Sequence, residues 1–187
     1  MSNTINIRKG LDIRLLGDAA KEIKELSVSK TVSLSPLDFH GLIPKLAVKE
    51  GEKVQVGDVI FYDKKNENIK YVSPASGTVR EIVRGEKRKI LQVLIDSDGK
   101  QTCKKFKVSK VADTSREDLM SLLMDSGLWP CFKQRPLDVV ADPTKEPKGI
   151  YVSSFDSSPL APDYEFILGD RMEQVQVGLK ALNVLCK

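Results

Sequence analysis

The stretch that decides the fold lies between residues 51 and 79, and it opens with GEKVQVGDVI (51–60) and closes with SPASGTV (73–79). Glycine, Asp or Pro bounds each short apolar run, and these residues form tight turns between strands. The predicted strands are 54–56, 59–62, 69–72, 78–83 and 90–95. The sequence therefore predicts a compact β module over residues 41–110, with the polar tract 63–68 as an exposed hairpin tip.

The segments that flank this module have other patterns. Residues 1–40 alternate apolar and polar positions between Ile5 and Leu15, which predicts an N-terminal arm that is extended or strand-like. Residues 111–148 combine a helix with a proline-rich crossing segment. The helix is predicted near 115–126, from a capping box at Thr114 and Glu117, leucines on one face, and Gly127 as the residue after its end.

The last segment, 149–187, predicts a strand at 149–152 and an amphipathic helix capped by Asp170. A strand, a loop and a helix open a β-α-β crossover, and a following parallel strand is needed to cover the helix. We therefore expect the truncated start of an α/β domain, and the chain to be the N-terminal piece of a longer polypeptide.

Composition excludes several functions. The 187 residues carry 30 Lys and Arg against 26 Asp and Glu, a net charge of +4 that is too small and dispersed to favour nucleic acid. The only histidine, His40, is expected to be structural or exposed, and three separated cysteines indicate reduced thiols, so no metal site is predicted. No two glycines stand two residues apart, which excludes the common phosphate loops for NAD and ATP. No apolar run is long enough for a direct membrane span.

The glycine and valine spacing of the β module resembles that of biotinyl and lipoyl domains, which have the barrel-sandwich hybrid fold. Such domains act as swinging-arm carriers when a lysine at the hairpin tip is modified. Lys64 and Lys65 are the candidates here. The Met-Lys-Met of biotin carriers is absent, and Lys64 lies off-centre between Gly57 and Pro74, which favours unmodified lysines. A carrier, or a protein-interaction module of the same fold, stays an alternative.

Three residues of the crossing segment form the candidate contact site for a quinone or a partner. Trp129 is interpreted as a core residue between the β module and the first helix, or, with Phe132, as part of an apolar slot or a subunit interface. Arg135 has the planar fork that binds carboxylates and other anions. No catalytic residue set is found. The basic run from Arg84 to Lys89 is interpreted as shielding an edge strand, with an acidic docking partner as the alternative.

Four blocks in order resemble the A-subunit of the bacterial Na⁺-translocating NADH:quinone reductase. They are Ile7-x-Lys9-Gly10-Leu11-Asp12, the β module up to Arg88, Ser126-Gly127-Leu128-Trp129-x-x-Phe132-x-x-Arg135-Pro136, and Asp156-x-x-Pro159-Leu160-Ala161. The resemblance implies an α+β chain: a barrel-sandwich hybrid module, then a helical segment and the start of a Rossmann-like α/β layer.

The same resemblance implies a peripheral, non-redox component of a translocating enzyme complex, at the cytoplasmic face of the bacterial inner membrane. The other subunits are the expected partners. Flavins and the iron-sulfur cluster are expected on those subunits and no cofactor in this chain, while the A-subunit family has been linked to quinone binding. The related Rnf electron-transport subunit is a further alternative, although its cysteine motifs for clusters are missing here.

Overall fold

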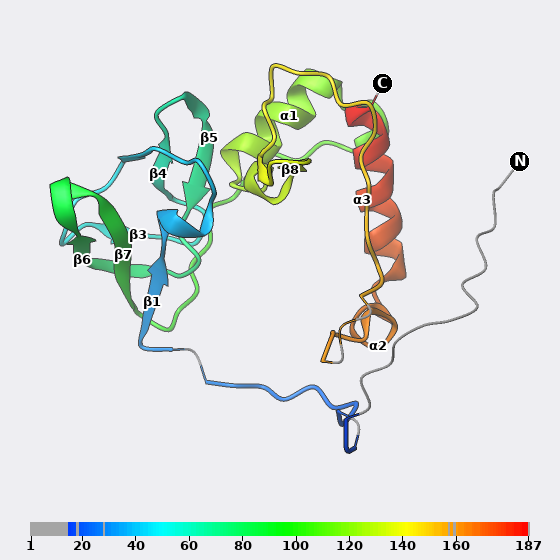
Figure 1. The fold of residues 1–187 in the computed structure, drawn as a ribbon, viewed down its shortest axis with the longest axis horizontal. Coiled ribbons are helices and arrows are strands. Elements are labelled where there is room, and N and C mark those ends of the chain that lie inside the picture. The colour runs from blue at the N-terminus through cyan, green and yellow to red at the C-terminus, as the bar shows by residue number, and fades with distance from the viewer. Residues whose placement is uncertain (1–14, 18, 28, 157, 159, 187) are drawn as a thin grey trace, which may run out of the picture.

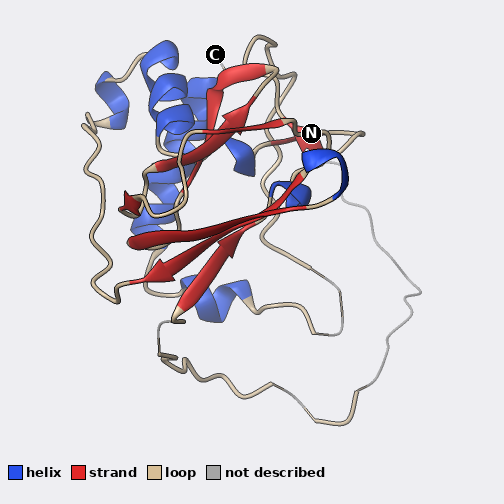
Figure 2. Cartoon of the chain, turned by 90° about the vertical axis from the view of Figure 1, so that its left-hand side faces the viewer, coloured by secondary structure: helices blue, strands red, loops and turns tan. Residues whose placement is uncertain are grey.

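The fold is known from a computed structural model that describes residues 15–186 except 18, 28, 157 and 159. The alternating set predicted between Ile5 and Leu15 therefore lies, apart from Leu15, outside the described residues. The β module and the helices occupy separate parts of the molecule, and α1 and α3 stand to one side of the strands (Figures 1 and 2).

Seven antiparallel strands form the two sheets of the β module. The first sheet has the order β1-β7-β6-β3 and the second the order β2-β4-β5. In chain order the strands are β1 (Thr31–Leu34), β2 (Pro44–Leu46), β3 (Lys53–Val54), β4 (Val59–Asp63), β5 (Asn66–Val72), β6 (Gly77–Arg84) and β7 (Ile90–Ser97). Strand β1 falls within the segment predicted as the N-terminal arm, so the sheet begins before residue 41.

The two stretches that decide the fold are hydrogen-bonded to each other. The backbone N–H of Gly57 donates to Ser73 at 3.0 Å, and that of Ser73 donates to Asp58 at 2.8 Å. At the other end Gly51 donates to Val79 at 2.7 Å. Gly57 has a φ of +92°, a conformation that side-chain-bearing residues rarely adopt. The glycines thus let the two halves of the module close on one another.

The core lies between the two sheets. Its most buried apolar side chains have no exposed surface and are Ile60, Phe61, Val79, Val93 and Ile95. Burying side chains of this size contributes about 1.5 to 3 kcal/mol each. The Tyr71 ring stacks on Phe61 at 5.0 Å between ring centroids and meets Phe39 edge-on at 4.5 Å. These core residues come from β4, β6 and β7, strands that the sequence predicted as short apolar runs between turn residues.

The β4–β5 hairpin has a shorter tip than the predicted tract 63–68. Asp63 pairs with Asn66, so Lys64 and Lys65 are the two turn residues. The placement of Lys64 off-centre was wrong, because bulges in the β4–β5 pairing make the two arms unequal in length. Both turn lysines are exposed, as predicted for the tip, and hydrogen bonds tie them to the segment before β2: Lys64 N–H donates to the Ile43 carbonyl at 2.8 Å, and Lys65 Nζ donates to the Gly41 carbonyl at 3.0 Å.

Helix α1 (Arg116–Asp125) confirms the helix predicted near 115–126. Its N-cap is Ser115, whose hydroxyl accepts from the Asp118 N–H at 3.1 Å, so the predicted capping box at Thr114 was wrong. The Thr114 hydroxyl instead donates to the Lys110 carbonyl, at the end of a short 3₁₀ turn, η3 (Val111–Asp113). Gly127 follows the helix with a φ of +73°, as predicted.

The proline-rich crossing segment contains regular structure that the sequence did not predict. A 3₁₀ turn, η4 (Trp129–Cys131), leads into a small hairpin of β8 (Lys133–Gln134) and β9 (Val139–Val140). Two other 3₁₀ turns lie in the β module, η1 (Pro36–Asp38) and η2 (Glu86–Arg88).

The C-terminal segment differs from prediction at its start. Residues 149–152 form no strand, because no other strand lies beside them in the described part of the chain, and the Tyr151 side chain is 97% exposed. A short helix that was not predicted, α2 (Tyr164–Leu168), is capped by Asp163. The long helix α3 (Met172–Leu185) starts after Arg171 and not after Asp170. Among the described helices none has the length and apolar character of a membrane span.

Candidate functional site

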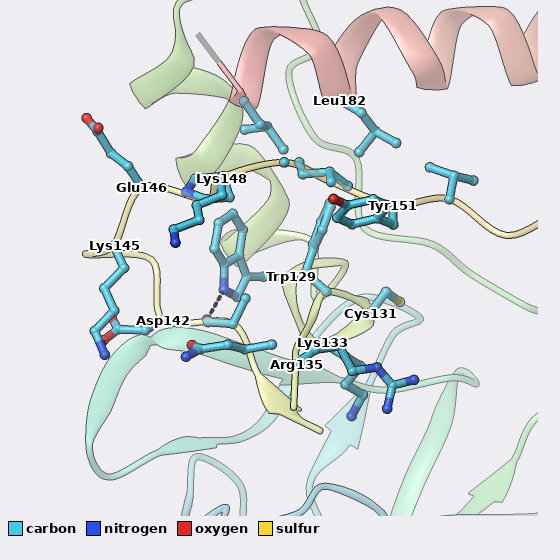
Figure 3. Close-up of a pocket in the computed structure, with 18 of the residues that line it drawn as sticks. Trp129, Cys131, Lys133, Arg135, Asp142, Lys145, Glu146, Lys148, Tyr151 and Leu182 are labelled. Carbon is cyan, nitrogen blue, oxygen red and sulfur yellow. Dashed lines mark hydrogen bonds and ion pairs between the residues drawn. The ribbon is translucent and has the colours of Figure 1, made fainter. Parts of the chain in front are cut away.

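The three residues predicted to contact a quinone or a partner line one open cleft of about 1120 Å³ (Figure 3). Trp129 and Phe132 come from η4 and the residue after it, and Arg135 follows β8. The opposite wall is the coil 145–153, and the end of α3 closes one side through Leu182 and Leu185. The structure therefore brings these three residues together on one surface.

The base of the cleft is aromatic and firmly held. Trp129 is 7% exposed and packs into the core between β5 and α1, as the core interpretation predicted. Its indole Nε1 donates to the Ala141 carbonyl at 2.8 Å, and its ring lies 5.3 Å from that of Phe132. A buried indole with a satisfied N–H has a fixed orientation. This base can pack against one face of a flat apolar group.

Arg135 lies at the rim with most of its side chain in solvent. Its guanidinium pairs with Asp138 at 3.3 Å, and the two side chains are 79% and 58% exposed. Exposed pairs of this kind contribute between about 0 and 1 kcal/mol, so an incoming anion can replace Asp138 at small cost. Arg135 can therefore bind a carboxylate or a polar head group at the cleft mouth.

Cations outnumber carboxylates around the cleft. The lining includes the basic residues Arg116, Lys133, Arg135, Lys145 and Lys148, against Asp142 and Glu146. Hydrogen bonds from Thr144 lower the pKa of Asp142, which also pairs with Lys145 at 3.7 Å. Two cations have other roles: Arg116 Nε donates to the Leu185 carbonyl at 3.2 Å, and Lys133 lies over the Phe39 ring. The cleft thus has an apolar base and a cationic rim.

The other residues singled out in the sequence lie elsewhere. His40 is exposed and precedes Gly41, whose carbonyl accepts from Lys65. Lys64 and Lys65 form the turn of the β4–β5 hairpin. Cys131 lines the cleft as an exposed thiol. No cluster of three or more His, Cys, Asp or Glu that could hold a metal occurs in the described ranges. The cleft offers an apolar and a cationic surface for binding.

The wall formed by residues 145–153 was missed in the sequence. Prolines at 143 and 147 indicated only a break in regular structure there. Lys148 and Tyr151 line the cleft together with Trp129 (Figure 3). Tertiary packing brings them there, and no local sequence pattern indicates it.

Comparison with known proteins identifies the family. The family model of the NqrA N-terminal barrel-sandwich hybrid domain matches residues 5–98, and that of the NqrA second alpha/beta domain matches residues 114–187. These matches confirm the predicted α+β fold class, a barrel-sandwich hybrid module followed by an α/β domain.

Three curated relatives are named as the A-subunit of a Na(+)-translocating NADH-quinone reductase. The protein of Pseudomonas aeruginosa strain PAO1 is 36% identical over 185 residues, which is 98% of this chain and 42% of the relative. That of Saccharophagus degradans is 37% identical over 95% of this chain and 40% of the relative. That of Marinomonas sp. strain MWYL1 is 39% identical over 96% and 41%. The chain spans about two fifths of the length of these relatives. Because the two NqrA domain models match residues 5–98 and 114–187, the chain belongs to the NqrA family.

Proposed function

We propose that the chain serves as the NqrA component of a Na⁺-translocating NADH-quinone reductase complex, in which it is a docking part without a redox group of its own. The observation that carries this proposal is the 34–39% identity to proteins of that name over 95–98% of the chain. Enzyme activity then belongs to the complex. Flavins and the iron-sulfur cluster reside on partner subunits, and the chain sits peripherally at the cytoplasmic face of the bacterial inner membrane.

Within that role, the cleft at Trp129 forms one wall of a quinone-access region. A quinone is a flat, mostly apolar ring with polar oxygens at its edge. The aromatic base supplies a packing surface for the ring, and the cationic rim supplies hydrogen-bond donors for the oxygens. The two halves of the cleft thus match the two kinds of surface on the ligand.

Co-purification tests the docking role. The chain, carrying an affinity tag, is expressed in its host and purified from gently solubilised membranes. Membrane subunits that contain flavin should elute with it, while the chain purified alone should be colourless. Elution with soluble proteins only would contradict the proposal and favour an independent interaction module, and a stoichiometric chromophore in the isolated chain would contradict the non-redox role.

Quinone access has a separate test, because Trp129 is the only tryptophan. A water-soluble quinone should quench its fluorescence at saturable concentrations. Phe132→Ala removes half of the aromatic base and should weaken the apparent affinity about tenfold, in line with the loss of an aromatic contact. Phe106→Ala is the matched control, since Phe106 lies near Gly57, outside the cleft. Equal quenching in both variants and the parent would contradict a quinone site here.

A modified carrier is the second candidate, because Lys64 and Lys65 occupy the hairpin turn. Both lysines are exposed, but Lys65 Nζ donates to the Gly41 carbonyl, and the Met-Lys-Met of biotin carriers is absent. Intact mass of the protein from its own host decides the matter, since an unmodified mass excludes the carrier. The Rnf alternative needs clustered cysteine ligands, and Cys103, Cys131 and Cys186 are free and dispersed in the sequence.

A further inference from the structure

The hairpin between β6 and β7 carries a dense positive charge at the end of the β module farthest from the helices (Figure 1). Residues 84–89 hold four basic side chains and one acidic one, 4 − 1 = +3. All four basic side chains are exposed, and none forms an ion pair within the described part of the chain; they are Arg84, Lys87, Arg88 and Lys89.

Protection of a sheet edge explains only part of this charge. In the sheet order β1-β7-β6-β3, β1 pairs only with residues 93–96 of β7, and β3 only with residues 77–78 of β6, so the ends of β6 and β7 next to the hairpin have no outer partner strand among the described residues. A charge at these ends discourages unwanted pairing, in line with the interpretation of the basic run as an edge shield. Only Arg84 lies on a strand, however, whereas Lys87, Arg88 and Lys89 lie in the turn beyond both strands.

The tip is also rigid. Gly85 N–H donates to the Lys89 carbonyl at 2.8 Å, and Arg84 Nη1 donates to the Arg88 carbonyl at 3.3 Å. Lys87 and Arg88 are held in the left-handed region, with φ of 52° and 62°, although neither is glycine. Such conformations persist where the surrounding structure enforces them, and they are concentrated at functional positions. The cations are thus presented in a fixed arrangement.

The surroundings of the tip favour one type of partner. A protein interface is centred on buried aromatic or aliphatic anchors, yet no large apolar side chain between residues 44 and 107 is exposed. An exposed hairpin tip with a net charge of +3 instead fits a diffuse anionic surface. We propose that this hairpin binds the phosphate head groups of anionic phospholipids and so holds this end of the β module against a membrane. This contact goes beyond the docking role, which requires only protein partners.

Sedimentation with lipid vesicles tests the contact on the whole chain. The protein should bind vesicles of phosphatidylglycerol and phosphatidylcholine, ignore vesicles of phosphatidylcholine alone, and be released by salt. Each Lys or Arg near an anionic surface strengthens binding about fivefold. The double variant Lys87→Asn/Arg88→Asn should therefore weaken binding about 30-fold. Asparagine tolerates the left-handed region, so this variant is designed to keep the hairpin fold.

The matched control is Lys105→Gln/Lys107→Gln, which removes two exposed cations from another part of the β module. It should retain most of the binding. The proposal is overturned if the parent chain does not bind anionic vesicles, if it binds both vesicle types equally, or if the two double variants lose the same affinity. Poly-glutamate is the probe for the other partner class: binding to it by a chain that ignores anionic vesicles would assign the hairpin to an acidic protein.

Discussion

Gly77 is a residue whose lack of a side chain is required by the sheet. A Cβ there would lie 1.9 Å from the Asp96 carbonyl oxygen on the neighbouring strand β7. Gly77→Ala must therefore displace backbone, and we expect it to lower the free energy of unfolding by about 3 kcal/mol, measured by urea denaturation. Gly51→Ala is the control: its φ is +82°, but its Cβ would enter open space, so only conformational strain of about 1 kcal/mol is expected. Equal losses would contradict the steric argument.

The contribution of Asp98 to the stability of the fold depends on pH. Its pKa is lowered mainly by the hydrogen bond from the Ser76 hydroxyl, at 2.6 Å, and further by the Lys100 N–H, at 2.9 Å. A folded-state pKa below the unfolded value of about 3.9 means that the stabilisation is complete above that pH and is lost as pH falls through the folded pKa.

Asp98→Asn should therefore destabilise the protein near neutral pH, and the difference from the parent should shrink in acid. Denaturation midpoints of both proteins at pH 6 and below the unfolded pKa of about 3.9 check this. Ser76→Ala should show the same trend, because it removes the donor. A difference that does not change with pH would contradict the role of the Ser76 hydrogen bond.

The C-terminal end of α1 packs closely against β5. Gly127 has a φ of +73°, and its Cβ would lie 2.6 Å from Val72 Cγ2. An ion pair between Lys70 of β5 and Asp125 of α1 spans the same contact. Gly127→Ala should thus combine strain with overpacking and cost about 2 kcal/mol. The Trp129 fluorescence should also change, because η4 packs on both elements.

The same substitution in α3 is predicted to have the opposite sign. Gly178 lies inside that helix with nothing within 4 Å of its Cβ position. Alanine is favoured over glycine in a helix interior by about 0.8 kcal/mol, so Gly178→Ala should raise the free energy of unfolding. A stabilising Gly127→Ala would contradict the close packing of α1 on β5.

Elements with a strong local pattern were predictable. The strands between Val59 and Ile95 are apolar runs bounded by turn residues, and the structure confirms four of the five predicted strands closely. The strand predicted at 54–56 is shorter: β3 is Lys53–Val54, and Val56 makes only an isolated bridge to Cys103. Helix α1 was also found, although adjacent Thr114 and Ser115 could not be separated as caps by residue type alone.

Elements that depend on a distant partner were not predictable. Residues 149–152 have strand-forming side chains, yet a strand requires a neighbour, and the described structure supplies none. In the candidate site the aromatic base comes from one short segment, so Trp129, Phe132 and Arg135 could be found together. The wall at 145–153 comes from packing between segments and has no local signature.

The parts of the molecule differ in how closely they are packed. The β module has a closed core, whereas α3 leaves Met172, Val177 and Leu179 about half exposed. The coil that leads to α2 and α3 exposes Tyr151 and Phe155, and no ladder hydrogen bonds hold its described residues 149–156. Local opening should therefore be easy in this coil and difficult in the sheets.

Limited digestion with trypsin tests this difference, because both regions offer exposed lysines. Lys145 and Lys148 lie in or beside the coil, and Lys87 and Lys89 lie in the tight β6–β7 hairpin. Opening that hairpin requires breaking the β6–β7 ladder, which pairs residues as far as Arg84 and Ile90, so its cleavage should be slower by a factor on the order of 100. Mass spectrometry of early fragments should find cuts after Lys145 or Lys148 and an intact β6–β7 hairpin. Early cleavage after Lys87 or Arg88 would mean that the cationic tip is not rigid, and the fixed charge arrangement inferred for lipid binding would then lose its basis.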